Sequence, residues 1–393
     1  MNPDEIRSQA RDWYAEHWST EHCVGQWWET LAQSGWGYPG WPTERFGRGL
    51  GRAEVRIVRD ERRRVGALGP PSGIGPSLMA PILFEHGTDE QLDRYLPQLA
   101  WGGATMCQML SEPDAGSDLA GVTTTAEQDG DEWVITGSKI WTSLANEVDY
   151  GMMLARTDWD VPKHRGLTFF LITRDQPGVE VRPLRTMTGG SSFNQVFFNE
   201  ARVSATDVVG APGDGWNVTR TFLVLEKNSY NPGAHEGGPF GKVDLASTCG
   251  ELLQKQKDSK AASRQGRGVG RMITELAERS GRNDDPLVRQ SLAHLRWLRQ
   301  SVGSLQGPAN KIAVSRLTST QRDVGLGLAG AHGMLVGDDS PAPTFASFAI
   351  GTPALSIAGG TDEIQRNSIG EKILGLPPEP KPDPNRSFRD ERK

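Results

Sequence analysis

The segment MLSEPDAGSDLAG, residues 109–121, concentrates groups that can hold a polar ligand. Ser111, Ser117 and Asp118 alternate with small residues, and Gly116 allows a backbone to come close to a ligand. Adjacent N–H and hydroxyl groups bind polar heteroatoms or phosphate. On spacing alone, an ordinary Asx- and Ser-rich surface turn is the alternative.

A second segment, GSKIWTS at residues 137–143, places an indole close to a hydroxyl. Trp141 and Ser143 are two residues apart, so on a strand both side chains project from the same face. An indole beside a hydroxyl suits a flat heteroaromatic ligand that also accepts hydrogen bonds. A core tryptophan with an incidental serine is the alternative.

One carboxylate, Glu226, lies on a largely apolar stripe of a predicted helix. The residues that recur at spacings of three and four are Trp216, Thr219, Leu223, Glu226 and Tyr230. Desolvation on this face is expected to raise the pKa of the carboxylate, which suits a base working near neutral pH. An ion pair with a neighbouring cation such as Lys227 is the alternative.

Three kinds of element are expected to position these groups. Residues 1–105 are predicted to be mostly helical, and residues 106–212, with short β-branched and aromatic runs between turns, to form an antiparallel β unit. The helical period returns over residues 213–376, except for 231–265, which is predicted to be a mobile excursion. The proline-rich, charged tail 377–393 is predicted to be disordered.

The composition is that of a soluble globular protein: 393 residues, 36% hydrophobic and 23% charged, with a net charge of −6. No apolar run of about 18 residues exists, and the polar N-terminus has no signal core, so no membrane association is expected. Three widely spaced cysteines argue for the reducing cytoplasm. The scattered histidines predict no metal site, and the acidic balance predicts no nucleic-acid binding.

The order of the motifs resembles the acyl-CoA dehydrogenase family over nearly the whole ordered length. The matching segments are GWGYPGWPTERFGRG, LSEPDAGSD, GSKIWTS, SSFNQVFFNEARV, GAPGDGW and AGGTDEIQRNSIGEKILGLP. The resemblance implies a mainly α chain with an N-terminal helical domain, a middle antiparallel β-barrel domain and a C-terminal four-helix bundle. It also implies an FAD enzyme of fatty acid or steroid degradation that oxidises an acyl-CoA thioester to the trans-2-enoyl-CoA.

The resemblance also assigns roles to individual residues. By position, the expected FAD contacts are Gln108, Leu110, Ser111, Gly116, Ser117, Trp141, Ser143, Thr361 and Glu363. The expected substrate contacts are Ser117, Leu223, Tyr230, Gly359 and Gly360. The family usually has Thr at the position of Ser143, so the hydroxyl is kept.

The residue that most family members use as the α-proton base is missing. Many members have Tyr-Glu-Gly-Thr before the last bundle helix, where this chain has Ala358, Gly359, Gly360 and Thr361. A second family solution places the base on an earlier helix, where this chain has Glu226. We therefore predict that Glu226 removes the α-proton while the β-hydrogen leaves as hydride to flavin N5. The glycines are expected to make room for substrate, and Thr361 is a good N-cap for the helix that follows.

Two family motifs that reach the flavin of a neighbouring subunit are incomplete. Arg-x-x-Phe-Gly is absent, and Gln-x-x-Gly-Gly-x-Gly has Gly327 and Ala331 in place of its Gln and second Gly. This resembles actinobacterial members, some acting on steroid side chains, in which two different subunits share flavin sites. The implied partners are an acyl-CoA, electron-transferring flavoprotein, and either further copies in a homotetramer or a related subunit in a heterotetramer. The alternatives are a non-catalytic partner subunit and a same-fold flavin monooxygenase or nitroalkane oxidase.

Overall fold

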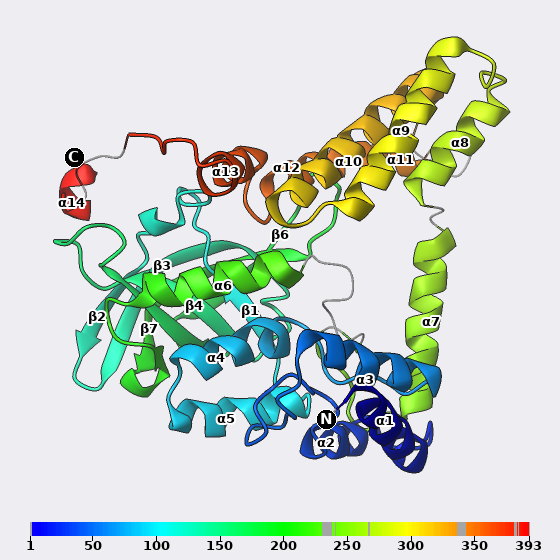
Figure 1. Ribbon diagram of the computed structural model, residues 1–393. Coiled ribbons are helices and arrows are strands. Elements are labelled where there is room, and N and C mark those ends of the chain that lie inside the picture. The colour runs from blue at the N-terminus through cyan, green and yellow to red at the C-terminus, as the bar shows by residue number, and fades with distance from the viewer. Residues whose placement is uncertain are drawn as a thin grey trace. The chain divides into compact units, whose positions relative to one another are not determined.

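Figure 1 shows the computed structural model, in which helices precede and follow a sheet along the chain. The structure describes residues 2–229, 238–239, 241–265, 268–335, 343–380, 383 and 385–392. Contacts divide the chain into two compact units. The first comprises Met1–Arg185, Ser191–Lys257 and Pro382–Lys393, and the second Thr186–Gly190 and Asp258–Lys381. The domain boundaries at residues 105, 212 and 376 stay predictions.

The N-terminal part of the first unit is helical, as predicted. Its helices are α1 (Pro3–His17), α2 (Val24–Gln33), α3 (Arg52–Arg64), the π-helix η1 (Gly75–Met79), α4 (Ala80–His86) and α5 (Asp89–Ala100). Capping boxes at Asn2 and Thr88 satisfy the free N–H groups that begin α1 and α5. Trp27, Trp28 and Tyr14 are buried in the core between these helices.

An eight-stranded sheet follows. Its strands are β1 (Met106–Met109), β2 (Thr125–Asp129), β3 (Glu132–Ser143), β4 (Tyr150–Arg156), β5 (Leu167–Thr173), β6 (Val179–Leu184), β7 (Phe193–Ser204) and β8 (Val208–Val209). The order is β6-β7-β3-β2-β4-β5-β8, with β1 beside β4. β1 and β2 run parallel to β4, and the other pairs are antiparallel. Among the described residues no pairing joins β6 to β8, so the predicted barrel is not confirmed.

The helix that carries Glu226, α6 (Gly215–Ser229), packs against β5 and η1 within the first unit. Figure 1 shows it lying across the sheet. Val218 and Phe222 anchor it in the same core as Phe169 of β5. This helix therefore contacts the sheet. Farther along, residues 249–265 form helix α7 (Cys249–Gln265), which corrects the predicted excursion for that part of 231–265.

The second unit is helical. Its elements are α8 (Val269–Arg279), α9 (Pro286–Ser304), α10 (Gly307–Ala329), η4 (Gly330–Met334), α11 (Pro343–Gly351), α12 (Pro353–Ile357), α13 (Asp362–Ser368) and the π-helix η5 (Ile369–Ile373). Helix α10 contacts α8, α9, α11, α12 and α13, so it is the central helix of this unit. The buried core includes Ile273, Leu328 and Phe345.

The C-terminal tail departs from the prediction of disorder over 377–393. Helix α14 (Phe388–Glu391) forms within it, and only 4% of the Phe388 surface is exposed. The ring of Phe388 packs against Trp159 and the guanidinium of Arg156. A proline-rich, charged composition predicts disorder by its average, and a single well-placed aromatic residue overrides that average here. For residues 388–391 the prediction was wrong.

Candidate functional site

The loop that follows β1 is held by a buried carboxylate. Glu112 accepts hydrogen bonds from the N–H groups of Thr123 (2.7 Å) and Thr124 (2.9 Å) and from the Thr123 hydroxyl (3.0 Å). Lys139 Nζ on β3 donates to Glu112 at 2.8 Å and to the carbonyl of Leu110 at 3.1 Å. These bonds fix both ends of the segment 110–123 to the sheet.

Burial and charge oppose each other in this pair. Burial raises the pKa of Glu112, but the charge of Lys139 and the donated hydrogen bonds outweigh it, so the pKa lies below its ordinary value. Burial lowers the pKa of Lys139, and the carboxylate of Glu112 opposes that effect. The sequence analysis did not identify this pair. Its signal was a lysine inside a strand that is otherwise largely apolar.

Gln108 and Glu226, predicted separately as a cofactor contact and as the base, lie together. Gln108 Nε2 is 3.5 Å from Glu226 Oε1, a long and therefore weak hydrogen bond. The other amide atom, Gln108 Oε1, is buried without a hydrogen-bond partner among the described residues. A buried amide oxygen of this kind is available to a ligand.

The remaining residues of the loop differ in exposure. Leu110 is buried, Ser111 is partly buried, and Gly116 and Ser117 are exposed. A Cβ atom built on Gly116 would meet no described atom within 4 Å, so space is open beside this backbone. The loop therefore presents hydroxyls and open backbone on its outer side, which suits a ligand-binding turn and an ordinary surface turn alike.

Trp141 stands out from the strand that carries it. The register between β3 and β7 shifts between Lys139 and Thr142, and Trp141 has a left-handed φ of 61°. Trp141 is 54% exposed, and its ring makes a T-shaped contact with Phe193, with 5.8 Å between the ring centroids. Ser143 is partly buried, and Thr142 between them is buried. Strained residues at a bulge cluster at functional sites, and here the strain holds a large ring in the open.

One face of helix α6 is buried along most of its length, and Glu226 lies near the C-terminal end of that face. Gly215, Thr219 and Phe222 are buried, and Glu226, four residues after Phe222, is partly buried. Leu223 is partly buried against the core of the sheet. The predicted contact Tyr230 lies outside the described residues. The carboxylate thus sits at the partly covered end of an apolar helix face.

In the second unit, the backbone conformation of the turn before α13 requires its two glycines. Gly359 and Gly360 have φ of 66° and 84°, a conformation that strains any residue with a Cβ atom. Gln365 Nε2 donates to the Gly359 carbonyl at 3.0 Å. The hydroxyl of Thr361 accepts the N–H of Ile364 at 3.2 Å, which confirms the predicted N-cap.

The two acids of this turn have partners in the second unit. Asp362 accepts Lys311 Nζ and the Ser315 hydroxyl, each at 2.8 Å. Glu363 is 75% exposed at its side chain and pairs with Arg366 at 3.1 Å. Both carboxylates lie in the first turn of α13, where negative charge interacts favourably with the positive end of the helix dipole. The roles of Gly359, Gly360, Thr361 and Glu363 toward cofactor and substrate stay predictions.

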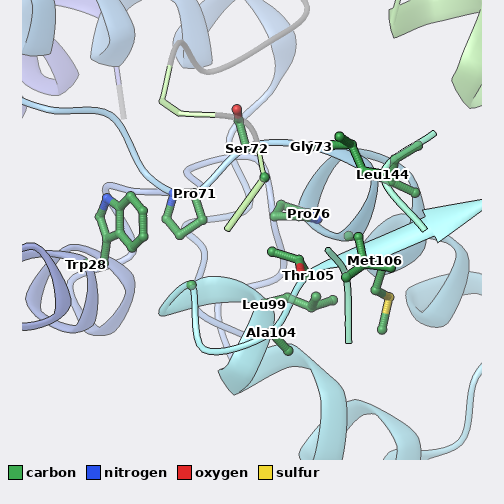
Figure 2. A pocket seen from close by; sticks show the side chains of 15 residues that line it. Trp28, Pro71, Ser72, Gly73, Pro76, Leu99, Ala104, Thr105, Met106 and Leu144 are labelled. Atoms are coloured by element: carbon green, nitrogen blue, oxygen red, sulfur yellow. The ribbon is translucent and has the colours of Figure 1, made fainter. Parts of the chain in front are cut away.

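A small, mainly apolar pocket lies in the first unit (Figure 2). Its lining includes Trp28, Pro71, Gly73, Ile74, Gly75, Pro76, Leu99, Met106 and Leu144. Met106 lies two residues before Gln108 on β1, and Leu144 directly follows Ser143. Gly75 and Pro76 belong to η1, which contacts α6. The pocket thus adjoins the start of β1, the residue after β3, and η1.

The described residues contain neither a metal-binding cluster nor a membrane-spanning helix. Within the described ranges, no cluster of three His, Cys, Asp or Glu side chains is arranged to bind a metal ion. In the same ranges, no helix is both long and apolar enough to cross a bilayer.

Two family models match the chain: the acyl-CoA dehydrogenase N-terminal domain over residues 3–103 and the acyl-CoA dehydrogenase middle domain over residues 107–201. The acyl-CoA dehydrogenase IpdE1 of Mycobacterium tuberculosis is 36% identical, over 96% of this chain and 99% of its own length. The chain belongs to the acyl-CoA dehydrogenase family. It is therefore an oxidoreductase that acts on acyl-CoA, and FAD is its cofactor.

Solved structures share the fold over nearly the whole chain. The Tcur3481-Tcur3483 steroid ACAD is 25% identical with a TM-score of 0.62, covering 96% of this chain and 98% of its own. The ChsE4-ChsE5 complex from Mycobacterium tuberculosis is 26% identical with a TM-score of 0.63, covering 95% of this chain and 97% of its own.

The first-unit residues fit FAD. The buried Gln108 Oε1 lacks a partner among the described residues, and the indole of Trp141 is uncovered. The hydroxyls of Ser111, Ser117 and Ser143 can donate to the heteroatoms and phosphates of the cofactor, and Gly116 leaves room beside the loop.

Proposed function

We propose that this acyl-CoA dehydrogenase removes hydrogen from Cα and Cβ of its thioester substrate, giving the trans-2-enoyl-CoA, with Glu226 as the α-proton base. The observation that carries the proposal is the approach of Gln108 Nε2 to Glu226 Oε1 at 3.5 Å. It links the proposed base to the strand that leads into the loop proposed to bind FAD. When bound, FAD supplies the acceptor for the β-hydrogen.

Each side chain has a distinct task in this proposal. Glu226 takes the α-proton, which the thioester carbonyl makes acidic. Gln108 donates to that carboxylate and so holds one oxygen in place, leaving its own Oε1 for the cofactor. Trp141 offers its exposed indole to the flat ring of the cofactor. The residues proposed to hold FAD are Gln108, Leu110, Ser111, Gly116, Ser117, Trp141, Ser143, Thr361 and Glu363.

Five residues are proposed for the substrate side. Ser117, Leu223 and Tyr230 are proposed to contact substrate, and Gly359 and Gly360 to leave space for it. We propose that the acyl group is bulky and of the steroid class, because the neighbour Tcur3481-Tcur3483 is described as a steroid ACAD. A panel of straight-chain and steroid acyl-CoA thioesters tests this, and preference for a short straight chain would contradict it.

We also propose that the chain works with a related subunit. Two solved neighbours are pairs of different chains, and this chain lacks the two motifs that reach a neighbouring flavin. Large apolar side chains are exposed on the second unit, which suits burial in an oligomer: Ile357, Ile373, Leu374 and Leu376. A homotetramer with full flavin content, formed by the chain expressed alone, would refute this.

The base is tested with Glu226→Gln. This variant should bind FAD normally but lose the flavin bleaching that acyl-CoA causes under anaerobic conditions. Glu85→Gln is the matched control, since Glu85 also bonds to α6, through the Thr221 hydroxyl at 3.2 Å, and is exposed. Near wild-type bleaching by Glu226→Gln would show that the base lies elsewhere.

A further inference from the structure

A buried arginine holds the end of the loop proposed to bind FAD. Arg156, the last residue of β4, is fully buried, and its guanidinium donates to three carbonyl oxygens. These belong to Ala120 (2.6 Å), Val122 (3.1 Å) and Lys163 (3.0 Å). Ala120 and Val122 follow the segment 110–118 directly. Arg156 therefore fixes the point at which this loop returns to the sheet.

The C-terminal tail covers the same arginine. The Phe388 ring centroid lies 3.7 Å from the guanidinium carbon of Arg156 and 5.5 Å from the ring of Trp159. The N–H groups of Phe388 and Arg389 donate to the carbonyls of Val161 (2.9 Å) and Trp159 (3.0 Å). The tail is thus attached by backbone bonds as well as by its aromatic side chain.

Two ion pairs connect the segment 157–166 to its neighbours, one to the tail and one to the loop. Arg389 pairs with Asp160 at 2.6 Å, on the same segment that receives the backbone bonds of the tail. Lys163, whose carbonyl accepts from Arg156, pairs through Nζ with Asp118 of the loop at 2.9 Å. The segment 157–166 therefore contacts the tail on one side and the loop on the other.

The charge of Arg156 explains why the tail matters. No carboxylate of the described residues forms an ion pair with this guanidinium, so carbonyl dipoles and an aromatic face must replace water around it. Burial lowers the pKa of Arg156 to about 10, which still leaves it charged at neutral pH. Without the ring, water would reach the guanidinium and compete with the carbonyls of Ala120 and Val122.

We infer that the C-terminal segment 385–392 is a strap that positions the FAD-binding loop. Phe388 positions Arg156, and Arg156 positions Ala120 and Val122; neither is proposed to touch the cofactor. The inference rests on the proposed function, because the loop binds FAD only in that proposal. It assigns to the last residues of the chain a role in cofactor affinity.

The first test is FAD affinity of the full-length protein. Phe388→Ala should raise the dissociation constant for FAD about 10-fold, and Phe388→Tyr, which keeps the ring, should stay within about two-fold of wild type. Arg182→Gln is the matched control, since it removes a guanidinium stacked on Phe197 (4.6 Å) in the same sheet. Equal FAD affinity in wild type and Phe388→Ala would overturn the inference.

The second test needs no cofactor. Hydrogen–deuterium exchange of the apoprotein should be faster at residues 118–123 in Phe388→Ala, and in a chain ending at Asp383, than in wild type. Unchanged exchange there would overturn the strap. If the wild-type chain bound no FAD either alone or together with a related subunit, the proposed function would be refuted instead, while this exchange experiment would still test the strap.

Discussion

Replacing Lys139 with Met tests how the loop proposed to bind FAD is fixed. In the wild type, the Glu112 carboxylate receives four hydrogen bonds from described residues, and among these donors only Lys139 carries a full charge. The side chains of Lys139 and Glu112 are 0% and 5% exposed. In Lys139→Met the carboxylate stays buried beside neutral donors only.

The expected loss follows from that burial. Removing one partner of a buried ion pair costs about 3–5 kcal/mol, because the remaining charge is uncompensated. Lys242→Met is the matched control: Lys242 lies 2.7 Å from Asp149, but its side chain is 56% exposed. An exposed pair at the same distance contributes about 0–1 kcal/mol. The two variants remove the same charge and differ in burial.

The assay is urea unfolding monitored by tryptophan fluorescence at pH 7. With a denaturant slope of about 3 kcal/mol/M, the midpoint should fall by about 1 M or more in Lys139→Met and barely move in Lys242→Met. The loss should also shrink toward pH 4.5. Without Lys139, burial raises the folded-state pKa of Glu112 above its unfolded value, so the variant loses stability as the pH rises.

Equal small losses in both variants would refute this reasoning, because burial would then carry no penalty. So would a loss in Lys139→Met that does not change with pH.

Three further outcomes are expected. In the wild type the pKa of Glu112 is lowered, so the stability that its carboxylate contributes is present above pH 4.5 and is lost as the pH falls through the folded-state pKa. Urea titration of Glu112→Gln at several pH values should show a smaller loss of stability at low pH. Gly360→Ala should destabilise the second unit by about 1–2 kcal/mol, since its φ is 84° and the added Cβ would lie 2.7 Å from Gln365 Nε2; an unchanged unfolding midpoint would exclude this strain. Thr361→Ala should cost about 1 kcal/mol through the lost cap to Ile364, as measured by circular dichroism in urea, and Thr361→Ser should restore it.

Local patterns predicted those parts of the structure that depend on nearby residues. The spacing on α6 predicted a buried face leading to Glu226, and the Gly-Gly-Thr turn predicted the N-cap at Thr361. The change of period near residue 105 predicted the passage from helices to strands. Each of these features is determined within about one or two turns of the chain.

Features that join distant segments were not predicted. Glu112 and Lys139 are 27 residues apart, and Arg156 and Phe388 meet only after the sheet and the tail have folded. Strand periodicity placed Trp141 and Ser143 on the same face but could not show the register shift beside Trp141 or its left-handed backbone. The barrel prediction came from the family resemblance, and the described strands pair as an open path.

Deuterium exchange at the substrate α-carbon tests the role of Glu226 most directly. When the enzyme is incubated anaerobically with a steroid acyl-CoA in D₂O, wild type should exchange the α-hydrogen, as seen by mass spectrometry of the recovered thioester. Glu226→Gln should show no exchange above the rate without enzyme, and Glu85→Gln should match wild type. Undiminished exchange by Glu226→Gln would contradict the assignment of this carboxylate as the base.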